Sequence, residues 1–276
     1  MLEISKSDTY ITLFDNITEL ANYISRPRKP GRENSSERSG PAFSGTNSYE
    51  EAFNGLKYGD EKLYNEIKKE REKINIDKFL GNVANRTKYE NRVYGCVPNV
   101  PAYLTKNPVN MINPEKNIIS HKIVNIFLNV GVSGGVDKED IIRNGITYLN
   151  VIDLLDKAGY RCNLYAGVSA RDDDYFFMYV KVKTDREPLN IKKVAFPIVS
   201  PSMLRRIYFK WAEVFDYDKD ITQWGYGGVV GNETTKEYLK ENIKEDFILW
   251  DYHDGSNSKS IEKILEDLKQ QGITIQ

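Results

Sequence analysis

Polar and glycine residues at the ends of two apolar runs are the first candidates for chemistry in this chain. They are Asn129, Gly131, Ser133, Asp137, Asp251 and Asp254. Amide, hydroxyl and carboxylate oxygens are the ligands that Mg²⁺ prefers in proteins, and Mn²⁺ accepts the same donors. A metal-dependent hydrolase or nuclease is therefore one hypothesis, although no cofactor is required by the sequence.

The glycines in this region allow two other interpretations. In the stretch 131–135, glycine backbone N–H groups followed by a helix could hold an anion. A nucleotide-binding P-loop would need Gly-Lys-Ser or Gly-Lys-Thr here, and the dinucleotide spacing G-x-G-x-x-G is also not met. Glycines equally permit a tight strand-to-helix turn, and this structural interpretation is the favoured one.

A second group of residues is suited to binding another macromolecule. Its members are Arg28, Lys29, Arg32, Arg205, Arg206, Trp224 and Tyr226. Arginine, tyrosine and tryptophan anchor protein interfaces, and aromatic residues beside basic ones also bind nucleic acid. The formal net charge of the chain is −1, so nucleic acid is possible but not the favoured partner.

Composition restricts the classes further. The chain has 276 residues and 40% hydrophobic residues, which is enough for a substantial core. No apolar run approaches the ~20 residues of a membrane-spanning helix. The two cysteines cannot form a disulfide framework or a four-cysteine zinc site. We therefore expect a cytoplasmic protein with reduced thiols and no membrane partner.

Strand and helix patterns alternate in the second part of the chain. The expected elements are a buried strand at 123–130, a helix from Asp137 to Gly159, a hairpin of 160–168 and 175–182, helices at 188–199 and 200–215, a strand at 246–250, a helix capped within 256–258, and a strand at 272–275. This order predicts an α/β core domain over 116–276, with a Rossmann-like sheet and helices on both faces.

Residues 1–115 are expected to form a helical, loop-rich N-terminal extension with a strand at 10–14. Asn16 with Glu19, and Ser48 with Glu51, form capping boxes that predict two helix starts. Residues 26–41 contain five basic and two acidic residues and no large apolar one, which favours a mobile arm. The proline-rich stretch 94–114 is expected to be an irregular connection that its apolar residues attach to a core.

Two resemblances add to this interpretation. The strand end resembles the metal site of von Willebrand factor A domains, whose Asp-x-Ser-x-Ser pattern aligns with Asn129, Gly131 and Ser133, so the site looks degenerate. Four blocks, at 43–52, 95–111, 143–160 and 201–207, resemble a family of tailed-phage proteins, the domain of unknown function DUF7192. That resemblance implies a phage gene product in the cytoplasm of an infected bacterium, and it implies no catalytic residues.

The favoured function is a non-catalytic accessory factor that binds a host or phage protein, for example in counter-defence or assembly. No complete catalytic constellation is present, while 18 tyrosines, 11 phenylalanines and 3 tryptophans supply interface residues. A metal-dependent enzyme and a nucleic-acid-binding protein are the alternatives.

Overall fold

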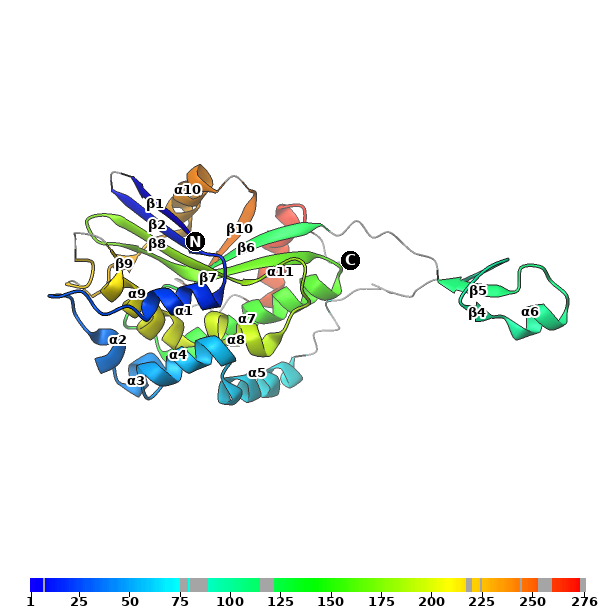
Figure 1. Cartoon of the computed structure of the whole chain (residues 1–276), viewed down its shortest axis with the longest axis horizontal. Coiled ribbons are helices and arrows are strands. Elements are labelled where there is room, and N and C mark those ends of the chain that lie inside the picture. The colour runs from blue at the N-terminus through cyan, green and yellow to red at the C-terminus, as the bar shows by residue number, and fades with distance from the viewer. Residues whose placement is uncertain are drawn as a thin grey trace.

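The computed structural model describes residues 1–6, 8–74, 79, 89–114, 122–216, 220–223, 225–243, 245–252 and 260–273. A seven-stranded mixed sheet forms the centre of the main body, with the order β1-β2-β8-β7-β6-β10 and with β9 beside β7 (Figure 1). Its strands are β1 Leu2–Lys6, β2 Thr9–Phe14, β6 Ile123–Asn129, β7 Arg161–Arg171, β8 Tyr175–Lys183, β9 Gly228–Val229 and β10 Phe247–Asp251.

Most neighbouring strands along this path are parallel. β2 runs parallel to β8, and β6 runs parallel to both β7 and β10, whereas the pairs β1/β2 and β7/β8 are antiparallel. The predicted strand at 123–130 and the predicted hairpin are confirmed as β6 and as β7 with β8. Because β1 and β2 belong to the same sheet, the sheet crosses the predicted boundary between 1–115 and 116–276.

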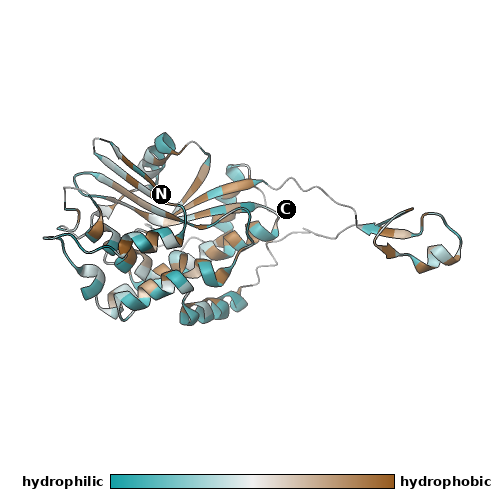
Figure 2. Cartoon of the chain, viewed as in Figure 1, coloured by the Kyte–Doolittle hydropathy of each residue, from teal (hydrophilic) through white to brown (hydrophobic). Residues whose placement is uncertain are grey.

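The two faces of the sheet carry separate apolar clusters, because side chains alternate along each strand. In β8, Phe176 and Met178 belong to the large cluster, while Phe177 and Tyr179 belong to the small one. Figure 2 shows hydrophobic residues along the central strands and hydrophilic residues along outer helices such as α5. This two-faced pattern requires helical cover on both sides.

Helices supply that cover unequally. They are α1 Ile17–Ile24, α2 Ser35–Arg38, α3 Pro41–Ser44, α4 Tyr49–Tyr58, α5 Glu61–Lys73, α7 Lys138–Lys157, α8 Ile191–Val199, the π-helix η2 Met203–Tyr208, α9 Phe209–Val214, α10 Asn232–Asn242 and α11 Ile261–Gln270. Leu239 of α10 belongs to the small cluster, whereas α1, α4, α7, α8, η2 and α9 contribute to the large one (Figure 1). The protein is therefore an α/β protein whose mixed β-sheet is flanked by helices.

Local helix signals are largely confirmed. The Asn16 side chain accepts from the backbone N–H of Glu19, and the Ser48 hydroxyl accepts from that of Glu51. Gly159, just after α7, has a φ of 87°. The helix α11 begins after Ser260, whose side chain accepts from the Lys263 backbone N–H. The predicted cap within 256–258 lies outside the described residues, as does half of the predicted strand at 272–275.

The segment 26–41 contacts the main body, although its sequence predicts a mobile arm. It contains the short helix α2, and Arg32 and Ser36 are buried within it. The prediction considered only burial of apolar side chains. Here the segment is attached through polar groups, whose hydrogen bonds to η2 and α9 are described below.

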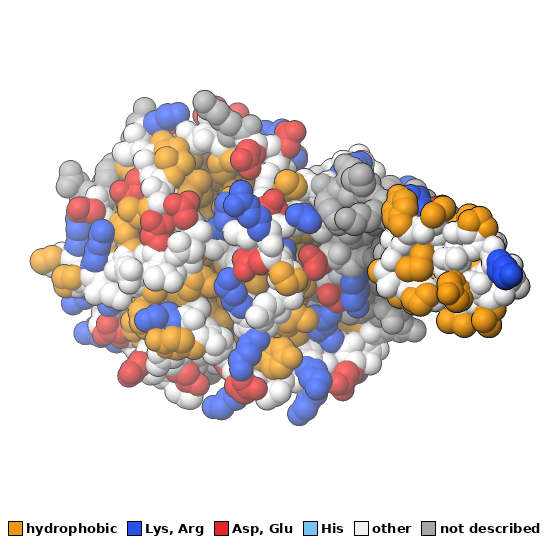
Figure 3. All heavy atoms as spheres, turned by 45° about the vertical axis from the view of Figure 1, so that its right-hand side comes forward, with side chains coloured by type: hydrophobic (Ala, Val, Ile, Leu, Met, Phe, Trp, Pro, Cys, Tyr) orange, Lys and Arg blue, Asp and Glu red, His pale blue; other side chains and the backbone are white. Residues whose placement is uncertain are grey.

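Residues 89–114 form a small unit with its own sheet, in the order β3-β5-β4. Its elements are β3 Tyr89–Arg92, β4 Val97–Pro98, α6 Val100–Leu104 and β5 Met111–Pro114. Figure 1 shows this unit apart from the main sheet, and Figure 3 shows hydrophobic side chains gathered over its surface. The expected attachment of this stretch to a core is therefore wrong, because no side chain among residues 90–113 is buried.

No helix in the described ranges is long and apolar enough to cross a membrane.

The two cysteines differ in environment, so we expect them to differ in reactivity. Cys96 is exposed, whereas burial raises the pKa of the Cys162 thiol to about 12. Because the thiolate is the reactive form, a thiol reagent should label one cysteine in the native protein and two after unfolding. A Cys96→Ser variant should lose all rapid labelling, and equal native labelling rates at both positions would contradict this assignment.

Candidate functional site: a pocket at the carboxyl ends of the central strands

A cavity of about 390 Å³ lies where the central strands end. Its walls come from Phe43, from residues 131–134 after β6, from 168–170 in β7, from the glycine-rich stretch 225–229, and from four residues of η2 and α9, namely Leu204, Arg205, Tyr208 and Phe209. The carboxyl ends of strands are the usual place for ligands in open α/β sheets. The volume lies within the range of about 300–1,000 Å³ that is common for small-molecule sites.

The pocket brings together residues that the sequence assigned to different sites. The sequence analysis predicts Gly131 and Ser133 in a metal or anion site, and Arg205 and Tyr226 as interaction residues; all four line this pocket. They lie in three segments far apart in the chain. No local sequence pattern signals this convergence, because it depends on how the segments pack after β6 and β7.

Asn129 lies beneath the pocket and is fully buried. Its amide oxygen accepts hydrogen bonds from the backbone N–H groups of Gly131 and Ser169, both at 3.1 Å. The side chain therefore fixes the turn after β6 against β7. An oxygen that already accepts two hydrogen bonds is a poor ligand for a cation. The described residues at this strand end therefore do not suit Mg²⁺ or Mn²⁺.

The structure places the other predicted metal ligands that it describes in different elements, and only Asp251 among them is a strand partner of Asn129. Asp137 is the N-cap residue of α7, and Asp251 pairs with Asn129 in the register of β10 and β6. Asp254 lies outside the described residues. Among the residues that the structure describes, no group of three His, Cys, Asp or Glu could hold a metal ion. A metal site that includes Asp254 stays a prediction.

Arg205 is the one basic side chain among the residues that line this pocket, and it is only 1% exposed. Its two terminal nitrogens donate to the carbonyl oxygens of Phe43 and Val136, each at 2.6 Å, and its guanidinium lies 4.1 Å over the Phe43 ring. Its Nε–H is buried without a hydrogen-bond partner. Burial lowers the pKa of Arg205, and the charge of Asp137 partly opposes that shift.

Arg206, the next residue, has a different role. It is fully buried, and its guanidinium donates to Thr46 Oγ1 and to the carbonyl oxygens of Ser36, Ser39 and Thr46 at 2.7–2.9 Å. All three of its nitrogens have partners. Arg206 therefore attaches the segments around α2 and α3 to η2 and is not available to a ligand.

The glycine-rich loop has an unusual backbone. Gly225, Tyr226 and Gly227 have successive φ values of 82°, 68° and 83°. Residues other than glycine rarely adopt this left-handed backbone conformation. Tyr226 is held there by its ring, which stacks on Phe209 at 4.0 Å, and by its hydroxyl, which donates to Glu213 at 2.8 Å. Trp224, predicted beside it, lies outside the described residues.

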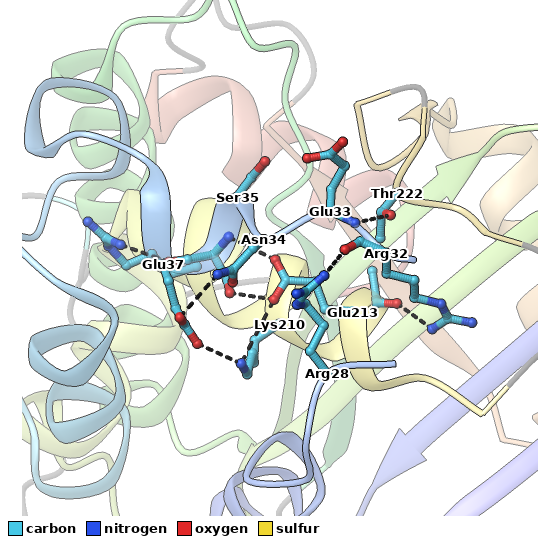
Figure 4. A network of polar contacts seen from close by, with 12 residues as sticks. Arg28, Arg32, Glu33, Asn34, Ser35, Glu37, Lys210, Glu213 and Thr222 are labelled. Atoms are coloured by element: carbon cyan, nitrogen blue, oxygen red, sulfur yellow. Dashed lines mark hydrogen bonds and ion pairs between the residues drawn. The ribbon is translucent and has the colours of Figure 1, made fainter. Parts of the chain in front are cut away.

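Glu213 of α9 is a fully buried carboxylate that holds this loop and the segment 26–41 together. It accepts from the Ser36 backbone N–H at 2.9 Å and from the Ser36 hydroxyl at 2.6 Å, in addition to Tyr226. Lys210 Nζ lies 3.9 Å from Glu213 and 2.9 Å from Glu37. Figure 4 shows both Lys210 and Glu213 pointing toward the segment that carries Glu37.

The three basic residues predicted as an interaction group in 26–41 all contact this chain. Arg28 donates to the Arg32 carbonyl oxygen, and Lys29 forms an ion pair with Asp216 (Figure 4 shows Arg28 and Arg32). Arg32 is 5% exposed and donates to the carbonyl oxygens of Ala212 and Phe215. These contacts attach the segment to α9, and nucleic-acid binding through it stays a prediction.

The element η2, which carries Arg205, is a π-helix of six residues. The sequence predicts a regular helix here, because the apolar residues recur at helical spacing. π-helices are rare and are frequently found at functional sites. Together with the left-handed loop, η2 makes two irregular backbone segments that face one pocket, and such irregularity is a reason to look for function there.

The fold and the pocket define a mixed α/β protein with a small-molecule-sized cavity at the ends of its central strands. The chain belongs to the family of the domain of unknown function DUF7192, whose model matches residues 3–275. No curated protein matches the chain, and no solved structure does.

Proposed function

We propose that this chain is a non-catalytic factor that binds another protein through the unit of residues 89–114. The observation that carries the proposal is the exposure of apolar side chains on this unit. Six large hydrophobic residues there are at least half exposed, namely Val93, Tyr94, Val97, Val100, Tyr103 and Leu104. The main body exposes few such side chains among its described residues.

A unit of this size cannot bury enough apolar surface to be stable alone, and below about 40 residues a disulfide, a metal or a partner is usually needed. Residues 90–113 contain no buried side chain. Packing against a second surface would remove the apolar side chains from water. Each large side chain that becomes fully buried would contribute about 1.5–3 kcal/mol.

Charge indicates the chemistry of the partner surface. The unit has three charged residues, and two of them, Glu90 and Arg92, form an ion pair at 2.9 Å. Lys106 is the third. A nearly uncharged surface rich in valine and tyrosine complements an apolar protein surface, and the tyrosines are residues that often anchor interfaces.

The pocket supports a binding role over a catalytic one. Its described lining contains no carboxylate, imidazole, thiol or amine, and burial raises the pKa of both its tyrosines, Tyr208 and Tyr226, above the ordinary value. A general acid or base needs a pKa near the working pH. The groups on these walls can bind a ligand but are poorly placed to move protons.

The setting is also part of the proposal. The four sequence blocks resemble tailed-phage proteins, so we place the protein in the cytoplasm of an infected bacterium, where the partner is a host or phage protein. We likewise retain the von Willebrand factor A-like core as a proposal. It is supported by the β6–α7 connection, where Asn129 and Ser133 occupy positions of the Asp-x-Ser-x-Ser pattern.

A double variant, Val100→Asp with Leu104→Asp, tests the proposal because it places two carboxylates on α6. A partner captured from infected cells and then purified should bind the wild type and should bind this variant at least about tenfold more weakly, the effect of losing one strong apolar contact. Titration calorimetry with both purified proteins measures the difference.

The control is Tyr58→Asp, which changes an equally exposed residue at the end of α4 on the main body. It should leave partner affinity unchanged. If the wild type forms dimers that the double variant abolishes, the surface binds a second copy and the proposal fails. A lowered melting temperature in the double variant would mean that the unit packs on its own chain, and that result also overturns the proposal.

A further inference from the structure

We propose that the pocket at the ends of β6 and β7 binds a small planar anion of the nucleoside monophosphate class, with its phosphate toward Arg205. This site is separate from the protein-binding unit and goes beyond the function proposed above. It rests on three features of the described residues: a buried cation with no carboxylate oxygen within 4.0 Å, backbone donors beside it, and aromatic and glycine residues in the lining.

The cation is the strongest of these features. Buried charges in proteins are paired with an opposite charge or a metal, because an uncompensated charge in the interior is costly. Among the described residues, no carboxylate oxygen lies within 4.0 Å of the Arg205 guanidinium. The side chain is held in place by the carbonyl oxygens of Phe43 and Val136 and by the Phe43 ring. Lys183 and Lys210, two other buried cations, each have a carboxylate within that distance. Arg206 also lacks such a carboxylate, but all of its nitrogens have partners, whereas the Arg205 Nε–H is buried without one. An anion beside Arg205 would supply both the missing hydrogen-bond partner and the missing opposite charge.

Backbone donors are available in the turn beside Arg205, which contacts the Val136 carbonyl oxygen at the end of that turn. Within the part of the chain that the structure describes, the N–H groups of Val132, Ser133 and Gly134 donate no hydrogen bond. The turn that carries them is fixed from below by Asn129 and leads into the N-terminus of the twenty-residue helix α7. Donors in this arrangement, together with the positive end of a helix, bind phosphate groups. The N-terminus of α7 adds to the attraction that Arg205 exerts on the phosphate, and the proposal does not depend on it alone.

The aromatic and glycine residues of the lining favour a ring as the other half of the ligand. Five glycines line the pocket, at positions 131, 134, 225, 227 and 228, and they present bare backbone. Phe43, Tyr208, Phe209 and Tyr226 supply aromatic surface. Aromatic side chains stack on nucleobases without strong sequence preference. A cavity of about 390 Å³ is large enough for a base, a ribose and one phosphate.

The test uses calorimetry on the full chain with AMP, GMP, CMP, UMP, adenosine and inorganic phosphate as separate probes. We expect at least one monophosphate to bind with a Kd below about 1 mM, and adenosine and phosphate to bind at least about tenfold more weakly, because each lacks half of the contacts. Arg205→Met should weaken the monophosphate at least about tenfold through loss of its charge.

A second variant keeps the test decisive if Arg205→Met fails to fold. Gly134→Asp adds a carboxylate to the pocket wall, and its side chain meets open space, with no atom within 4 Å of an added Cβ. It should fold and should also weaken the monophosphate at least about tenfold by repulsion. Arg143→Met, at an exposed position on α7, removes one positive charge away from the pocket and should leave binding unchanged.

Three results would overturn the proposal. The first is that none of the six probes binds the wild type. The second is that a monophosphate binds but Gly134→Asp leaves its affinity unchanged, which places binding elsewhere. The third is that inorganic phosphate binds as tightly as every monophosphate, which removes the planar ring from the ligand. None of these results depends on whether residues 89–114 bind a protein.

Discussion

Gly167→Ala should destabilise the protein by at least about 4 kcal/mol, a loss that few single substitutions cause. Gly167 lies in β7, between β6 and β8, and pairs with Asn129 on one side and Tyr179 on the other. An added Cβ would lie 1.9 Å from the Met178 carbonyl oxygen and 2.6 Å from the Tyr179 Cα. Because both are backbone atoms of the neighbouring strand, no side-chain rotation relieves the clash.

The loss of free energy should be measured by urea unfolding, followed by the tryptophan fluorescence and far-UV circular dichroism. Gly135→Ala is the matched control, since no atom lies within 4 Å of its added Cβ. That variant should differ from the wild type by no more than about 0.5 kcal/mol. A Gly167→Ala protein that unfolds at the wild-type urea concentration would show that β7 and β8 are not paired in this register.

Glu213→Ala should cost about 3–5 kcal/mol, the usual penalty for breaking a buried charged network by removing one partner. The substitution leaves the buried Ser36 backbone N–H without an acceptor and the Lys210 ammonium without its inner carboxylate. It also frees the hydroxyl of Tyr226, which lies in a backbone conformation that its contacts must maintain. We therefore expect lower stability together with increased proteolysis within 26–41.

Glu37→Ala provides the comparison because Glu37 contacts the same Lys210 nitrogen, at 2.9 Å, from a half-exposed position. Lys210 is buried, but it keeps Glu213 at 3.9 Å when the half-exposed Glu37 is removed, so this variant should lose no more than about 1 kcal/mol. Chemical unfolding gives both free energies, and limited proteolysis with mass spectrometry locates the cleavage sites. Equal losses for the two variants would mean that burial of Glu213 does not determine the effect.

The sequence predicts the central elements well because their signals are local. The β-branched run of β6, the capping residues of α1 and α4, and the turn between β7 and β8 each lie within a few residues of the element that they specify. The polar attachment of 26–41 has no such signal. Ser36, Arg206 and Glu213 are distant in sequence, and serine, arginine and glutamate ordinarily indicate an exposed segment.

The same reasoning explains what the sequence predicts of the candidate site. Four residues that the sequence predicts as site residues, Gly131, Ser133, Arg205 and Tyr226, line the pocket, and their roles stay a prediction. Their grouping was not predicted, because β6, η2 and the 225–229 loop meet only in the folded chain. The π-helical form of η2 was also missed, since the apolar spacing of residues 203–211 fits a regular helix.

The pairing of β2 with β8 has a consequence for synthesis of the chain. β2 ends at Phe14 and its parallel neighbour β8 ends at Lys183, so a ribosome adds about 170 residues between them. At ~5–20 residues per second this takes on the order of ten to thirty seconds. Throughout that interval Tyr10, Ile11 and Phe14 lack the strand that pairs with theirs, so we expect a chaperone to bind nascent β2 until β8 emerges.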